Sequence, residues 1–181
     1  ICIEEKIQNQ YKFQEFQKLL AMEQSKAYKD FGNSCFNEIN GSKGVVDNLR
    51  TQASNFIKKG DYGNAIAQYN TIINEGKATA LDYNGLGYTY LITKQYGKAI
   101  KSLSEGEKLD NTELLVKLNL AHAYLLNDDY RAAKSIYKEY QTQNVTDSLS
   151  WIQKIKIDFT AFKKLGLPSD NFERILKLIE R

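Results

Sequence analysis

Aromatic and small residues recur along the middle of the chain with a period of 34 residues, separated by stretches rich in Lys, Asn and Gln. Repeats of this length are considered before local structure, because each is one structural unit that buries its apolar face against its neighbours. The series are Ala65, Ala99 and Ala133; Tyr62, Tyr96 and Tyr130; and Phe56, Tyr90 and Tyr124. Since three series share one step, the pattern predicts three consecutive units.

Each unit carries two apolar faces with helical spacing. In the second unit, four apolar or small positions fall at i, i+3, i+4 and i+7, and a second face follows a break near Thr93 to Gln95. The first face holds Tyr83, Leu86, Gly87 and Tyr90, and the second holds Tyr96, Ala99 and Leu103. Small residues such as Gly87 and Ala99 let two helix backbones approach closely. The sequence therefore predicts an array of helical hairpins.

This pattern resembles the tetratricopeptide repeat (TPR), in which bulky, small and aromatic residues occupy set positions of a 34-residue unit. In that frame the repeats run over 46–79, 80–113 and 114–147. The departures include Gln52, Lys117 and the absence of Pro near the end of every unit. The resemblance implies an all-α fold, a TPR-type α-solenoid of stacked antiparallel helical hairpins with N- and C-terminal capping helices.

Residues 1–45 do not follow the repeat. Apolar residues from Ile3 to Leu20 lie along one side of a Gln-, Glu- and Lys-rich stretch, which predicts an amphipathic helix ending near Phe31 and Gly32. The glycines Gly32, Gly41 and Gly44 predict a linker into the array. The N-terminal helix either caps the array or lies in its groove.

Residues 148–181 continue the frame only as a degenerate fourth repeat, with Trp151 at its bulky position. They predict a capping helix over 148–165 and, after a break at 166–168, a last helix that opens with Asp170 and Glu173 as a capping box. An end cap that shields the last repeat is preferred here over a second binding surface.

Composition and charge exclude several classes of protein. The 181 residues are 42% hydrophobic and 26% charged with a single Pro, which fits a globular protein built from long helices. No stretch approaches the roughly twenty apolar residues of a membrane span. The net charge of +3 arises in residues 148–181, with seven basic and four acidic side chains. Because so small an excess creates a weak field, we expect no nucleic-acid partner.

Residues for catalysis or metal binding are scarce. The chain has no GxGxxG, GxxxxGK[ST], HExxH or GxSxG motif. His122 is the only imidazole, and with Cys2 and Cys35 it is too small a set for a zinc site or a nucleophilic triad. We therefore expect no catalysis, no cofactor and no metal. The start at Ile1 suggests a removed signal peptide, a removed tag or a longer parent chain, so cytoplasmic and exported locations both stay open.

The resemblance to TPR proteins also implies a binding groove on the concave side, lined by the first helix of each hairpin. The predicted peptide-binding residues are Arg50, Lys58, Asn84, Tyr88, Leu91, Leu118, His122 and Leu125. This groove is apolar in the middle, which suits an amphipathic helix or an apolar extended segment of a partner, with the two cations steering an acidic flank. The residues of the TPR clamp for chaperone carboxylates are absent except for Arg50, so that ligand is not expected.

An apolar groove of this size needs a cover. A partner peptide provides one, and so does the N-terminal helix, or a closed superhelix in which these side chains are core. The sequence thus predicts a non-catalytic protein-interaction module. Its alternatives are an accessory TPR domain of a larger or exported protein whose own N-terminal helix covers the groove, and a self-associating module in which homo-oligomers form.

Overall fold

The computed structural model describes residues 21–180, which contain eight helices and one two-stranded ribbon. The expected amphipathic face from Ile3 to Leu20, and Cys2, lie outside the described residues. The chain divides into two compact units, 1–48 and 49–181. The predicted site residues all belong to the second unit.

Helix α3 (Ala21–Lys59) contributes residues to both units. It runs without interruption through Gly32, Gly41 and Gly44, so the predicted helix end near Phe31 and the predicted linker are wrong. An interior glycine costs a helix about 1 kcal/mol relative to alanine, which weakens a helix without breaking it.

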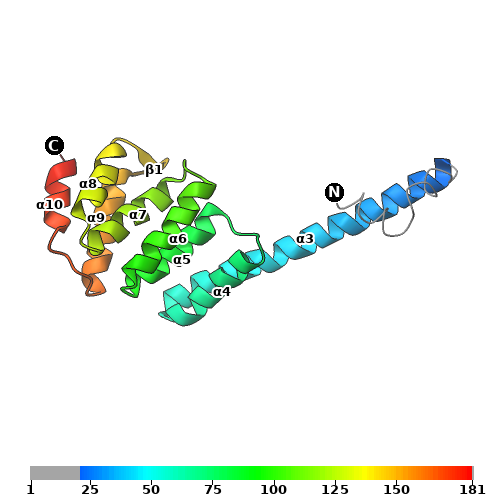
Figure 1. Ribbon diagram of the computed structural model, residues 1–181, viewed down its shortest axis with the longest axis horizontal. Coiled ribbons are helices and arrows are strands. Elements are labelled where there is room, and N and C mark those ends of the chain that lie inside the picture. The colour runs from blue at the N-terminus through cyan, green and yellow to red at the C-terminus, as the bar shows by residue number, and fades with distance from the viewer. Residues whose placement is uncertain (1–20, 181) are drawn as a thin grey trace. The chain divides into compact units, whose positions relative to one another are not determined.

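The repeats form the predicted helical hairpins. Helices α4 (Tyr62–Asn74), α5 (Ala80–Ile92), α6 (Tyr96–Leu109), α7 (Leu114–Leu126) and α8 (Tyr130–Glu139) follow one another with short turns between them. They lie side by side in chain order (Figure 1). The arrangement is the stacked helical array that the 34-residue period predicts.

The turn inside each hairpin uses one repeated backbone geometry. Gly60, Lys94 and Asp128 lie 34 residues apart and have left-handed φ angles of 76°, 62° and 63°. Next to the first and last of these, Asp61 and Asp129 accept hydrogen bonds from backbone N–H groups at the start of α4 and α8. The turn therefore repeats with the period of the array, although only one of its three left-handed residues is a glycine.

Small residues bring the paired helices close together, as predicted. A methyl group added at Gly87 of α5 would lie 2.5 Å from the Leu103 side chain of α6. Ala65, Ala99 and Ala133, at the equivalent position of each second helix, are fully buried. The aromatic and aliphatic side chains beside these contacts fill the space between hairpins.

The chain after α8 departs from the all-helical expectation over a few residues. Strands β1 (Asn144–Thr146) and β2 (Leu149–Ser150) form an antiparallel ribbon that leads into α9 (Trp151–Lys164). At the junction, Ser150 and Gln153 form a capping box at the start of α9. The ribbon and this cap lie at the start of the C-terminal capping region, which runs from Trp151 to the end of the described chain.

The capping region ends with α10 (Phe172–Ile179), after a turn at Gly166 with a φ of 66°. The predicted capping box of Asp170 and Glu173 is wrong, because the residue that precedes the helix is Asn171 and makes no side-chain capping bond. Aromatic rings hold the region together instead, and the Phe159 and Phe172 rings stack with their centroids 4.0 Å apart. Trp151 is fully buried and donates its Nε1–H to the carbonyl of Tyr137 on α8.

Between residues 21 and 180, no helix has both the length and the apolar character needed to cross a membrane.

Candidate functional site

The predicted binding residues lie on the first helix of each hairpin. We call the side of α3, α5 and α7 that carries them the first-helix face. Arg50 and Lys58 belong to α3, Asn84, Tyr88 and Leu91 to α5, and Leu118, His122 and Leu125 to α7. On α5 and α7 these residues are three or four positions apart, and on α3 they are eight apart, which is about two turns. The residues on each helix therefore lie on one side of that helix.

Half of this predicted set is buried inside the fold. Leu91, Leu118 and His122 have no exposed surface, and Leu125 is 3% exposed. Their prediction as direct contacts to a partner is therefore wrong, and the alternative in which they are core residues describes them better. The apolar middle of the predicted groove is filled by the protein's own side chains.

Helix α9 explains part of this burial. The His122 ring lies 5.5 Å from the Phe159 ring and 5.1 Å from the Phe162 ring, centroid to centroid, and both phenylalanines belong to α9. The degenerate fourth repeat thus packs against α7 where a regular groove would be open.

A polar network accompanies these aromatic contacts. The Nδ1 atom of His122 lies 2.6 Å from the Tyr137 hydroxyl, and Nε2 lies 3.2 Å from Oδ2 of Asp158. Burial raises the pKa of Tyr137 well above its usual value, so this hydroxyl stays protonated. It therefore donates a hydrogen bond to Nδ1 of His122. The Nε2–H group then donates to the carboxylate, which fixes the tautomer of a neutral imidazole.

Two opposing effects act on each charged group of the network. Burial lowers the pKa of His122, although the carboxylate of Asp158 acts to raise it. Burial also opposes ionisation of Asp158, but bonds to His122 and to the Lys154 ammonium outweigh it and lower the pKa of that carboxyl. The network is enclosed, so it ties α7, α8 and α9 together and offers no acid or base to a substrate.

Asn84 and Tyr88 are half-buried, so each keeps part of its surface exposed on the first-helix face. Asn119 of α7 donates its Nδ2–H to Oδ1 of Asn84 over 2.8 Å, which joins neighbouring hairpins. Asn119 is not among the residues predicted from the sequence, and it stands 35 residues after Asn84, one residue beyond the repeat period. Burial is the main cause that raises the pKa of Tyr88, and the nearby Asp158 and Tyr62 raise it further. The Tyr88 hydroxyl is therefore protonated, with a carboxylate in its neighbourhood.

The two predicted cations differ in their surroundings. Arg50 binds both carboxylate oxygens of Asp82, at 2.8 Å from Nε and 2.7 Å from Nη2. That carboxylate also accepts bonds from the backbone N–H and hydroxyl of Thr79. Arg50 thus holds α3 to the start of α5. Its geometry favours this structural ion pair over the predicted role of attracting an acidic ligand. Lys58 is exposed and makes no ion pair with any described residue.

Within the described residues, no three His, Cys, Asp or Glu side chains come together in a group that would hold a metal ion.

Comparison with known proteins finds two tetratricopeptide repeats in the chain. The family model for the tetratricopeptide repeat matches residues 83–113 and 116–144, which fall within the second and third predicted units. Serine/threonine-protein phosphatase 5 from Homo sapiens, Rattus norvegicus and Mus musculus is 29% identical to the chain over 97 residues. The matched segment covers 54% of this chain but 19% of each phosphatase, so the chain spans about a fifth of those relatives. No solved structure matches the chain.

Proposed function

Because this chain carries tetratricopeptide repeats, which form a non-catalytic protein-interaction fold, we propose that it binds an extended peptide of a partner protein along its first-helix face. The proposal keeps Asn84, Tyr88 and Lys58 of the predicted set as contact residues. It adds Asn119, which is only 8% exposed but whose amide lies beside that of the half-buried Asn84.

The observation that carries the proposal is the amide pair of Asn84 and Asn119. Their mutual bond uses one acceptor of Asn84 and one donor of Asn119. The Asn84 NH₂ group and the Asn119 carbonyl oxygen make no further hydrogen bond to described residues. A free donor beside a free acceptor complements the carbonyl and N–H of a peptide bond, whatever side chains the peptide carries.

Tyr88 lies one helical turn from Asn84 on the same side of α5. Its half-buried ring offers apolar surface to a peptide side chain, and its protonated hydroxyl offers one more donor. Aromatic side chains of this kind contribute strongly to binding because they bury a large area with few rotatable bonds. Lys58 favours an acidic residue in the part of the peptide that reaches α3.

Burial of the leucines changes the expected ligand. An amphipathic helix needs a continuous apolar stripe in the receptor, and Leu91, Leu118 and Leu125 do not supply one. An extended peptide, which presents its backbone groups to the asparagine pair, fits the remaining polar surface better.

The test is a binding measurement with a matched control. Random peptides displayed on phage are selected on the full chain, and the affinity of a selected peptide is measured by calorimetry. Asn84→Ala is expected to weaken binding about tenfold, the effect of losing one well-placed hydrogen bond. Asn74→Ala removes the same side chain from an exposed position on α4 and is expected to leave the affinity unchanged. Equal affinities for both variants and the wild type would refute the proposal.

A second candidate keeps the same module as an accessory domain of a longer protein. The similarity to the three phosphatases supports it, because the matched segment makes up 19% of each of them. Reading the complete coding sequence tests this candidate, and a reading frame without any further domain contradicts it.

Self-association and a groove covered by the N-terminal helix stay predictions. Light scattering on the full chain tests the first. For the second, deletion of residues 1–45 is expected to raise peptide affinity if that segment competes for the first-helix face. Unchanged affinity contradicts the cover.

A further inference from the structure

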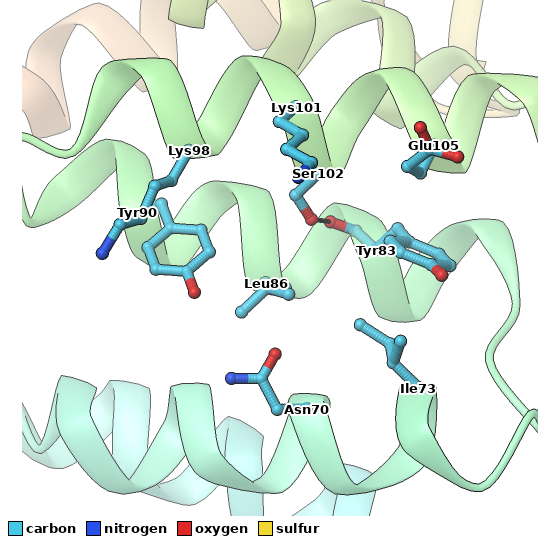
Figure 2. Close-up of a pocket in the computed structure, with 9 residues that line it drawn as sticks. All are labelled: Asn70, Ile73, Tyr83, Leu86, Tyr90, Lys98, Lys101, Ser102 and Glu105. Carbon is cyan, nitrogen blue, oxygen red and sulfur yellow. Dashed lines mark hydrogen bonds between the residues drawn. The ribbon is translucent and has the colours of Figure 1, made fainter.

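A hollow in the repeat region lies away from the first-helix face. It has a volume of about 500 Å³, within the usual range of ligand pockets. As Figure 2 shows, residues of α4 line one side of it, residues of α6 line the other, and α5 lies between them. Since α4 and α6 are the second helices of their hairpins, we call it the second-helix pocket.

The pocket uses a different side of α5 from the proposed peptide site. Successive residues of an α-helix are about 100° apart around its axis. Tyr83, Leu86 and Tyr90, which line the pocket, therefore point about 150° away from Asn84 and Tyr88. Substitutions in one site can be made without touching the other.

The floor of the pocket is apolar, and its polar groups have unused bonding capacity. Ile73 is half-buried and Leu86 is 5% exposed, and both line the pocket. The Asn70 amide and the hydroxyls of Tyr83 and Tyr90 make no hydrogen bond to any described residue, and they stand around this floor in Figure 2. Such a lining binds an apolar group that carries hydrogen-bond acceptors beside it.

The rim of the pocket on α6 is positively charged. The Lys98 ammonium lies 5.5 Å from the centre of the Tyr90 ring, and Lys101 is exposed without an ion-pair partner among the described residues. Glu105, the acidic residue of the lining, is paired with Lys108 at 2.7 Å. Two cations thus line the pocket, and the carboxylate beside them is paired with a third lysine.

The next repeat places its own side chains in the equivalent position. Counting 34 residues onward, Ile73 corresponds to Glu107 and Tyr83 corresponds to Lys117. Glu107 and Lys117 form an ion pair at 2.9 Å between the second and third repeats, where the junction of the first and second repeats has two uncharged side chains facing a hollow. The two rim lysines correspond to an alanine and a serine. The combination of an apolar floor and a cationic rim therefore occurs where the first and second repeats meet and is not reproduced where the second and third meet.

We propose that the second-helix pocket binds a large apolar side chain of a partner peptide that carries a carboxylate on the adjoining residues. The apolar side chain fills the space over Ile73 and Leu86, and the carboxylate lies against Lys98 and Lys101. This contact goes beyond the proposed first-helix site and gives the array a second docking point on another side.

The probe for this proposal is a short capped peptide with one phenylalanine followed by two aspartates, the other residues being glycine and serine. Comparison peptides replace phenylalanine by serine, or aspartate by asparagine. Binding is followed through the backbone amide signals of the isotope-labelled full chain. We expect saturable shifts at Asn70, Ile73, Lys101 and Ser102, with a dissociation constant on the order of 1 mM, and smaller shifts with both comparison peptides.

Two variants borrow the residues of the next repeat, so each places side chains that the fold already accepts at the equivalent position. Ile73→Glu with Tyr83→Lys introduces the ion pair and is expected to abolish the shifts. Lys98→Ala with Lys101→Ser changes only exposed residues of α6 and is expected to weaken binding about fivefold at low salt. Unfolding curves followed by Trp151 fluorescence establish that both variants are folded.

Any of the following results overturns the proposal: no saturable shift up to about 10 mM peptide, equal binding of the peptide that lacks aspartate, or equal binding by folded variants of both kinds. Shifts confined to Asn84 and Tyr88 overturn it as well, and they support the first-helix site. Loss of the pocket shifts in the variants with an intact response at Asn84 separates the two sites.

Discussion

Acid should destabilise the repeat region through His122, the only histidine of the chain. Its ring is fully buried, and burial lowers its pKa below the ordinary value of 6.5, with Lys154 acting in the same direction and Asp158 against it. Protonation would also remove the lone pair that accepts the Tyr137 hydroxyl. The imidazole of His122 therefore binds a proton less readily in the folded state than in the unfolded chain.

The size of the effect follows from this difference. Above the ordinary pKa of 6.5 both states are neutral, and His122 makes no pH-dependent contribution. Below it the unfolded state gains a proton first, so the free energy of unfolding falls as the pH falls. At about pH 5.5 the loss approaches 1.4 kcal/mol if the folded imidazole stays neutral. Asp158, whose pKa is lowered from 3.8, adds a further loss in the same direction only at more acidic pH.

The assay is urea unfolding monitored by the fluorescence of Trp151, the only tryptophan, which is buried against α8. The free energy of unfolding is compared at about pH 7.5 and about pH 5.5. His122→Gln is expected to be less stable at both values but to show no loss between them, because no other histidine titrates there. A wild-type stability that is constant or rises on acidification would show that the ion pair with Asp158 dominates over burial, and would refute this reasoning.

Two further predictions concern packing and charge. Gly87→Ala is expected to lower stability by about 1 to 3 kcal/mol, because its methyl group would lie 2.5 Å from Leu103. Gly97→Ala is the control, because its methyl group would meet no atom within 4 Å, and it is expected to raise stability by about 0.5 kcal/mol. Both variants are measured by denaturant unfolding. Midpoints that shift in the same direction for both variants would contradict the packing argument. Arg50→Ala is expected to cost about 2 kcal/mol, because Asp82 is 2% exposed and would lose its cation. Arg50→Lys should restore less than the full loss in thermal unfolding, and complete restoration contradicts a role for the two-point contact.

The helical array could be predicted from the sequence because its signal repeats. Ala65, Ala99 and Ala133 are buried at one position of every hairpin, and that requirement leaves the same residue type at a fixed spacing. The spacing also predicts the break near Thr93 to Gln95. It does not reveal the left-handed geometry that Gly60, Lys94 and Asp128 share, because three different residue types occupy this position. Local backbone geometry there depends on the hairpin around it more than on the residue itself.

The candidate site was harder to predict because exposure depends on how successive hairpins pack. Helical spacing correctly places Leu118, His122 and Leu125 on one side of α7, but it contains no information on whether another helix covers that side. Phe159 and Phe162 of α9 provide the cover. The sequence predicts an end cap over the last repeat, but it does not identify His122 as a residue that the cap shields. Asn84 and Tyr88 on α5 keep part of their surface exposed, whereas Leu91 on the same helix is fully buried.

Motif spacing alone was also insufficient at the end of the chain. Ser150 with Gln153 and Asp170 with Glu173 have the same spacing, yet only the first pair forms a capping box. The difference lies in where the helix begins, since α10 starts one residue later than that motif requires.

The central claim is that the amide pair on the first-helix face reads a peptide bond, and a backbone scan of a bound peptide tests it most directly. Each amide of a selected peptide is methylated in turn, and the loss of affinity is measured for the wild type and for Asn119→Ala. The account predicts one position where methylation costs the wild type about tenfold and costs the variant almost nothing, because both changes remove the same hydrogen bond. Methylation losses that are equal in the two proteins at every position would contradict it.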